Sequence, residues 1–123
     1  MSRVQLFCVH AFFLCLILPG ALLAQKKVIT SADFPPGGTS SPAILSDGTL
    51  NVSGQVGEDL KTHQIPADFE AEMKNCLTNI SLVLKAAGME MKDVVAVQVY
   101  LTDVSLFDRM LLIAEPLLPT PQV

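Results

Sequence analysis

The segment from residue 47 to residue 57 constrains the fold most, because a turn signal, a strand pattern and a polar cluster follow one another there. Asp47-Gly48 is typical of a two-residue hairpin turn, since both residue types tolerate a left-handed backbone. A strand should follow in which Leu50 and Val52 alternate with polar residues. We expect any chemistry to begin at Ser53-Gly54-Gln55, where the glycine lets another group approach the backbone closely.

A long amphipathic helix is the clearest element after the hairpin. From Phe69 to Ala87, apolar residues recur at helical spacing and form one continuous stripe. Asp68 is a suitable N-cap, and Gly88 is a typical C-terminal stop. Cys76 lies on the stripe, so we expect its thiol to be protonated and packed in the core rather than nucleophilic.

Two further strands and a second helix are expected around this core. β-branched residues at 26–31 indicate an edge strand, and alternating valines at 93–103 indicate a second strong strand covered on both faces. A helix should begin at Ser105, which is a possible N-cap. Together these patterns predict an α+β fold in which helices cover one face of a sheet.

Residues 1–24 have the pattern of a secretory signal peptide. Arg3 precedes an apolar run from Leu6 to Leu18, and Ala24 lies at the expected cleavage position. We therefore expect a periplasmic or secreted protein that begins near Gln25 and keeps no stable membrane span. An uncleaved membrane anchor is the alternative, although the run is shorter than the roughly 20 apolar residues of a full span.

The charge of the chain after the predicted signal argues against nucleic acid as a partner. Removing Arg3 from the 8 basic residues leaves 7 against 12 acidic ones, a formal charge of −5. Binding a phosphate chain needs several basic residues on one face. Of the 3 cysteines only Cys76 remains in this part, so no intrachain disulfide is expected there.

Signals for other chemistries are weak. Two isolated histidines, and one cysteine after the predicted signal peptide, give no metal-binding pattern, and no glycine-rich phosphate loop is present in the sequence. The triplets at 51–53 and 79–81 match the glycosylation sequence. Since one falls in a predicted strand and the other on a predicted helix, we interpret both as chance matches.

Four stretches together resemble the reactive intermediate deaminase family, known as RidA or YjgF. They are Ser-Pro-Ala-Ile-Leu-Ser-Asp-Gly-Thr-Leu-Asn-Val-Ser-Gly-Gln-Val-Gly at 41–57, Asp-Phe-Glu-Ala-Glu at 68–72, Leu-Lys-Ala-Ala-Gly at 84–88 and Asp-Val-Val-Ala-Val-Gln-Val-Tyr-Leu-Thr-Asp at 93–103. Each stretch alone is a weak signal, but they occur in the family's order and near its spacing. The resemblance covers residues 28–110.

The resemblance implies a chorismate-mutase-like fold with a mixed sheet, assembled as a homotrimer. It also implies cofactor-free hydrolysis of reactive 2-imino acids, such as 2-iminobutanoate and 2-iminopropanoate, to 2-keto acids and ammonia. In such a site an arginine grips the substrate carboxylate, while an acid and backbone groups position water. Ser53 and Gly54 match positions that line the family's substrate pocket, and Gln55 lies beside them. The alternative is that these three residues only close a strand at a bulge.

The chain departs from the family pattern at positions that bear on activity. Ser40 stands where the family has a tyrosine, and Leu111 stands where many members have an asparagine. The family's last two strands, which carry its arginine and its glutamate, have no counterpart in the proline-rich residues 111–123. Arg109 is the only arginine after residue 24, and it falls on the second predicted helix. We therefore expect an incomplete RidA-like domain at 25–110 and an unpatterned tail at 111–123.

Two classes of function remain open, and no catalytic residue can be assigned in either. The first is an exported imine or enamine deaminase whose activity is impaired in this chain. The second is a non-catalytic family member or fragment that binds small acids or a partner chain. A translation-inhibiting ribonuclease, another activity attributed to the family, is disfavoured by the acidic composition.

Overall fold

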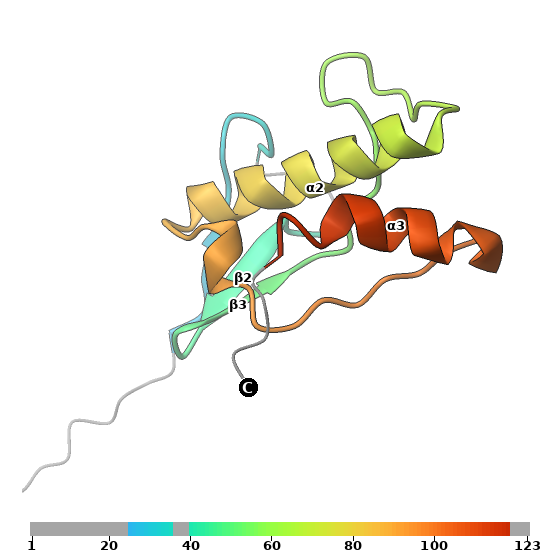
Figure 1. Ribbon diagram of the computed structural model, residues 1–123. Helices are drawn as coiled ribbons and strands as arrows, with labels where there is room; N and C mark the ends of the chain where they lie inside the picture. Colours follow the sequence, from blue (N-terminus) through green and yellow to red (C-terminus); the bar gives the residue numbers. More distant parts are fainter. Residues whose placement is uncertain (1–24, 36–39, 119–123) are drawn as a thin grey trace, which may run out of the picture.

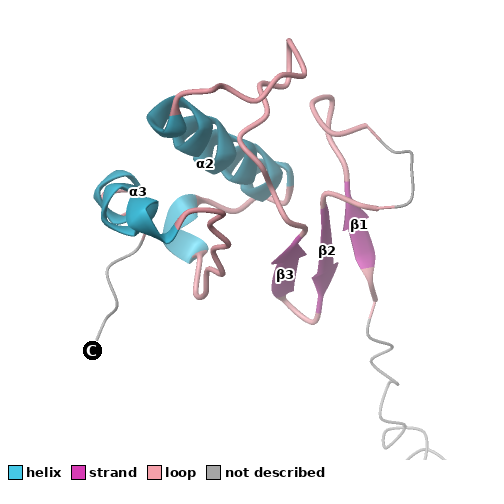
Figure 2. Ribbon diagram, turned by 90° about the vertical axis from the view of Figure 1, so that its right-hand side faces the viewer, coloured by secondary structure: helices cyan, strands magenta, loops and turns pink. Residues whose placement is uncertain are grey.

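The structure of this chain is a computed structural model that describes residues 25–35 and 40–118 (Figures 1 and 2). In chain order its elements are β1 (Lys27–Ile29), β2 (Ala43–Ser46), β3 (Thr49–Val52), α2 (Phe69–Ala86), the 3-10 turns η1 (Met91–Asp93) and η2 (Val104–Leu106), and α3 (Phe107–Ala114). The predicted signal peptide at 1–24 lies outside the described residues. None of the helices within them is long and apolar enough to cross a membrane.

The three strands form an antiparallel sheet in the order β1-β2-β3, and β1 is an edge strand as the sequence predicts. Its central hairpin is also confirmed. Asp47 has φ 50° and Gly48 has φ 77°, the left-handed pair that a tight two-residue turn requires, and Ser46 pairs directly with Thr49. Leu50 and Val52 pack inward while Asn51 between them is exposed, which confirms the predicted alternation.

The predicted long helix is present as α2, and both of its ends have the expected chemistry. The Asp68 carboxylate accepts a hydrogen bond of 2.9 Å from the Ala71 N–H. At the other end Gly88 has φ 75°, and the following Met89 N–H bonds the Leu84 carbonyl at 2.9 Å. These local bonds fix the boundaries of α2.

Two apolar clusters hold the layers together. Val83 of α2 is fully buried against Ile29 and Ala43, so one cluster joins the helix to the sheet. In the second cluster, Leu77 of α2 packs against Met110 and Ala114 of α3. Figure 2 shows both helices on the same side of the sheet, as expected of the α+β arrangement.

The prediction of a strand at 93–103 is wrong. Residues 94–103 are irregular, and the described sheet is therefore antiparallel rather than mixed. A strand needs a neighbouring backbone to pair with, and no described strand lies in register with this segment. Its side chains are accordingly uncovered: Val95 is 96% exposed and Tyr100 is 85% exposed.

The prediction for the end of the chain is wrong in two details. The Asp103 carboxylate accepts the Ser105 N–H at 2.9 Å and caps η2, while α3 starts at Phe107 with Leu106 at its N-cap position, so Ser105 caps neither element. Residues 111–114 are helical rather than unpatterned. Pro116 removes an N–H donor and restricts the residue before it, which ends α3 without preventing the turns that precede it.

Candidate functional site

The predicted site residues Ser53, Gly54 and Gln55 follow β3 directly and begin an irregular segment that crosses α2. The Ser53 N–H donates to the Pro42 carbonyl at 2.9 Å, and the Ser53 hydroxyl donates to the Ser41 carbonyl. Ser53 is exposed, but its hydroxyl proton is occupied by its own hairpin. With its proton donated to a carbonyl and not to a base, the Ser53 hydroxyl can only accept further hydrogen bonds, so Ser53 is not arranged as a nucleophile.

Gly54 is the most open position of the segment. A Cβ built on it would meet no other atom within 4 Å, so crowding does not require a glycine there. Among the described residues no carbonyl or side chain accepts the Gly54 N–H. This exposed donor is available to a ligand.

Side chains of α2 bind the carbonyl groups of the segment that follows Gly54. The Cys76 thiol donates to the Gln55 carbonyl at 3.3 Å. The Asn79 amide donates to the Val56 carbonyl at 3.1 Å and to the Glu58 carbonyl at 2.9 Å. α2 thus takes up three carbonyl acceptors of the segment, whereas the N–H and the carbonyl of Gly54 both have no partner among the described residues.

Two more contacts fix the segment against α2. The Asn75 amide donates to the Gly57 carbonyl at 3.3 Å. At Gly57 itself an added Cβ would collide with the main-chain oxygen of Glu72, so this position needs glycine for close approach. Sequence reasoning missed both asparagines, although their spacing of four residues beside the apolar stripe of α2 was a visible signal.

The structure agrees with two interpretations of the sequence: that the Cys76 thiol is not a nucleophile, and that the triplet at 79–81 is a chance match to the glycosylation sequence. Burial raises the pKa of the Cys76 thiol and the nearby Glu72 carboxylate raises it further, so the thiol stays protonated at neutral pH. Asn79 is 4% exposed and its amide is engaged twice. An asparagine in this position is no acceptor for a glycan in the folded chain.

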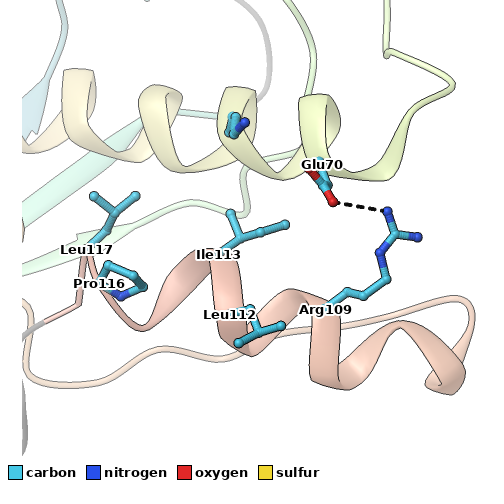
Figure 3. A pocket seen from close by; sticks show the side chains of 7 residues that line it. Glu70, Arg109, Leu112, Ile113, Pro116 and Leu117 are labelled. Atoms are coloured by element: carbon cyan, nitrogen blue, oxygen red, sulfur yellow. Dashed lines mark hydrogen bonds and ion pairs between the residues drawn. The ribbon is translucent and has the colours of Figure 1, made fainter.

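Arg109 lies in a different place from the predicted site residues. It projects from α3 toward the first turn of α2, where its guanidinium is 3.4 Å from the Glu70 carboxylate and 5.5 Å from the ring centre of Phe69 (Figure 3). It borders an open groove of about 390 Å³ between the two helices. The other lining residues are Glu70, Lys74, Leu112, Ile113, Pro116 and Leu117.

The remaining predicted positions show no common site. Ser40 is exposed and Leu111 is 43% exposed on α3. His63 bonds the Glu58 carboxylate at 2.7 Å on the surface. Across residues 25–35 and 40–118, no three histidine, cysteine or acidic side chains cluster closely enough to hold a metal ion.

Comparisons with known proteins agree on one family. The family described as Endoribonuclease L-PSP matches residues 30–122, which extends beyond residue 110, where the resemblance in sequence motifs ends. A 2-iminobutanoate/2-iminopropanoate deaminase of Bos taurus is 40% identical over 84 residues, which are 67% of this chain and 61% of that protein. A RutC family protein of Pyrococcus horikoshii is 38% identical over 88 residues, 70% of each chain.

A solved structure gives the same result for the fold. The crystal structure of RidA from an Antarctic Psychrobacter superposes with a TM-score of 0.70 at 33% identity, and the match covers 77% of this chain and 78% of that one. The part of this chain that aligns with the bovine deaminase spans 61% of that protein's length. The fold is thus that of RidA proteins.

Proposed function

This chain belongs to the Endoribonuclease L-PSP family, which includes the RidA proteins, and from that premise we propose that it binds small 2-imino acids. The substrates would be those named for its deaminase relatives, 2-iminobutanoate and 2-iminopropanoate. The observation that carries the proposal is the 40% identity with such a deaminase over 84 residues. In the reaction, water adds to the imine carbon, ammonia leaves from the resulting carbinolamine, and a 2-keto acid remains.

The polarity of the segment after β3 supports an acid as the ligand. Its carbonyls at Gln55, Val56 and Glu58 are bonded by α2, while the exposed Gly54 N–H has no partner among the described residues. A free backbone N–H attracts a carboxylate and offers nothing to a cation. We propose that this N–H, beside the accepting hydroxyl oxygen of Ser53, contacts the imino acid, and that Gln55 borders the same place.

We propose that hydrolysis by this chain is slow compared with that of its relatives. The carboxylate is the main group through which a protein can bind a small imino acid, and an arginine that makes two parallel hydrogen bonds is its usual partner. Arg109 instead pairs with Glu70 on the first turn of α2. Each 1.4 kcal/mol of lost transition-state binding lowers the rate about tenfold, so losing one such contact alone costs orders of magnitude.

The second candidate is a non-catalytic member that binds small acids or another chain. The position of Arg109 on α3, away from the segment after β3, favours this alternative over a fully active enzyme. The two candidates differ in rate but share the binding step. We also propose export, from the pattern of residues 1–24, and family-type self-association into a trimer.

The binding step is tested with 2-ketobutanoate, the stable product of the reaction, followed by ligand-observed NMR. Gly54→Pro removes the proposed N–H donor, whereas Gly54→Ala keeps it and has room for its methyl group. We expect the alanine variant to bind and the proline variant to lose binding at least tenfold. Equal binding by both variants would contradict the proposed contact.

The rate is tested separately in a coupled assay. A pyridoxal-phosphate ammonia lyase generates 2-iminobutanoate from threonine, and the appearance of the 2-keto acid is followed with and without this chain. We expect an acceleration at least tenfold below that given by a full-length deaminase relative. Equal acceleration, abolished by Arg109→Ala, would make Arg109 the carboxylate partner after all.

A further inference from the structure

The open groove between α2 and α3 is lined by residues that the proposed function does not use (Figure 3). Arg109, Ile113 and Leu117 are four residues apart, so they follow one another along one side of α3 and the turn after it. Glu70 and Lys74 have the same spacing on α2. The groove is therefore formed by one row of side chains from each helix.

The two ends of the groove differ in chemistry. Figure 3 shows the ion pair of Arg109 and Glu70 at one end. Pro116 and Leu117 lie at the other end, and Leu117 is 50% exposed. Leu112, which also lines the groove, is 74% exposed. Exposed leucines along a concave surface favour an apolar ligand, because covering them removes apolar surface from water.

The charged residues of the groove favour an anion, although the chain as a whole has a formal charge of −4. Lys74 and Arg109 are two cations, and Glu70 is the one carboxylate among the lining residues. In the part of the chain that the structure describes, Lys74 makes no ion pair. The Arg109–Glu70 distance of 3.4 Å is longer than the roughly 2.8 Å of a strong charge-assisted bond, and both side chains are about half exposed. A ligand anion can therefore compete with Glu70 for Arg109.

We propose that this groove binds a small organic acid with one compact apolar body, of the arylalkanoate class. Its carboxylate lies between Lys74 and Arg109, and its ring lies toward Pro116 and Leu117. At about 390 Å³ the groove is near the lower end of the roughly 300 to 1,000 Å³ of ligand sites, so one ring with a short acid chain fits it. The site shares no residue with 53–55 and does not depend on the proposed function.

Ligand-observed NMR with the full chain tests the class of ligand. The probe is 4-phenylbutanoate. Its counterpart 4-phenylbutanamide has the same apolar body without the charge, and acetate has the charge without the apolar body. Since both halves of the probe contribute to binding, we expect 4-phenylbutanoate to bind about tenfold more tightly than either counterpart. No binding of the acid, or equal binding of the acid and the amide, would overturn the proposal.

Two substitutions at the charged end should change the affinity for 4-phenylbutanoate in opposite directions. Arg109→Gln removes a cation and should weaken binding about fivefold, the size of an exposed ion pair. Glu70→Gln removes the competing carboxylate and should strengthen binding by a similar factor. Both side chains are about half exposed, so the fold tolerates either change. An unchanged affinity in both variants, or weaker binding by Glu70→Gln, would place the acid elsewhere.

The apolar end is tested with Leu117→Asn, which should weaken binding of the same probe about fivefold by removing apolar contact. Val104→Asn is the matched control, since Val104 is 84% exposed and lies outside the groove, and it should leave the affinity unchanged. An equal concentration of 2-ketobutanoate, the probe for residues 53–55, should not displace 4-phenylbutanoate. Equal effects of the two asparagine variants, or displacement by 2-ketobutanoate, would contradict a separate site in the groove.

Discussion

Asn79 is predicted to be the most sensitive polar position in the described structure. Its side chain is 4% exposed, and its amide donates to the carbonyls of Val56 and Glu58 at 3.1 and 2.9 Å. Asn79→Ala removes two hydrogen bonds and leaves two carbonyls facing a helix without a donor. At roughly 1 to 2 kcal/mol for each unsatisfied carbonyl, the free energy of unfolding should fall by about 2 to 4 kcal/mol.

Asn79→Asp separates hydrogen bonding from packing, because the two side chains have the same shape. An ionised carboxylate cannot donate, so it would face two carbonyl oxygens and bury a charge. We therefore expect the aspartate variant to be less stable than the alanine variant at pH 7. Asn75→Ala is the matched control on the same helix: its amide makes one bond of 3.3 Å, so about 1 kcal/mol is expected.

Urea unfolding followed by circular dichroism measures these differences, and thermal unfolding gives a second measure. For a chain of this size, a loss of 2 to 4 kcal/mol lowers the melting temperature by about 10 to 20 °C. The reasoning is refuted if Asn79→Asp unfolds within about 0.5 kcal/mol of the parent chain. That result would mean that water, and not α2, satisfies the carbonyls of the segment after β3.

Two further predictions follow from single contacts, and a third follows from the sequence pattern of residues 1–24. Gly57→Ala should lower the free energy of unfolding by about 3 kcal/mol or more, measured by urea unfolding, because its Cβ collides with the Glu72 main chain; a neutral effect would contradict the contact. The raised pKa of Cys76 means that folding favours its protonated thiol. The resulting contribution to the free energy of unfolding is complete below the usual thiol pKa and is lost as the pH rises through the raised pKa. Thiol labelling near pH 8 should accordingly be slow and should accelerate in Glu72→Gln, and equally fast labelling of folded and urea-unfolded chain would refute it. N-terminal sequencing of exported protein should begin near Gln25, whereas an intact Met1 would argue against cleavage.

Local chemistry explains what the sequence could predict. The hairpin needs only that Asp47 and Gly48 accept a left-handed backbone, and both do. The ends of α2 need only a carboxylate at Asp68 and a glycine at position 88. The layer arrangement follows once the apolar stripe of α2 is set against the inward residues of β2 and β3.

Long-range pairing explains what the sequence could not predict. Alternating valines at 93–103 show a preference for strand, but a strand forms only beside another backbone, and the pattern does not name that neighbour. The same limit applies to Asn75 and Asn79. Their hydrogen-bond partners lie 18 to 23 residues earlier in the chain. The sequence therefore shows that these positions of α2 are polar, but it does not show which carbonyl groups they bind.

The contacts of these asparagines also bear on the candidate site, because they orient the segment after β3. The carbonyls of Gln55, Val56 and Glu58 are bonded by α2, and the N–H of the exposed Gly54 has no partner among the described residues. Stability and ligand preference therefore depend on the same side chains: an Asn79 variant that frees the carbonyls also frees the segment to rotate. A loss of carboxylate binding in Asn79→Ala, at a temperature where the rest of the chain stays folded, would link the two.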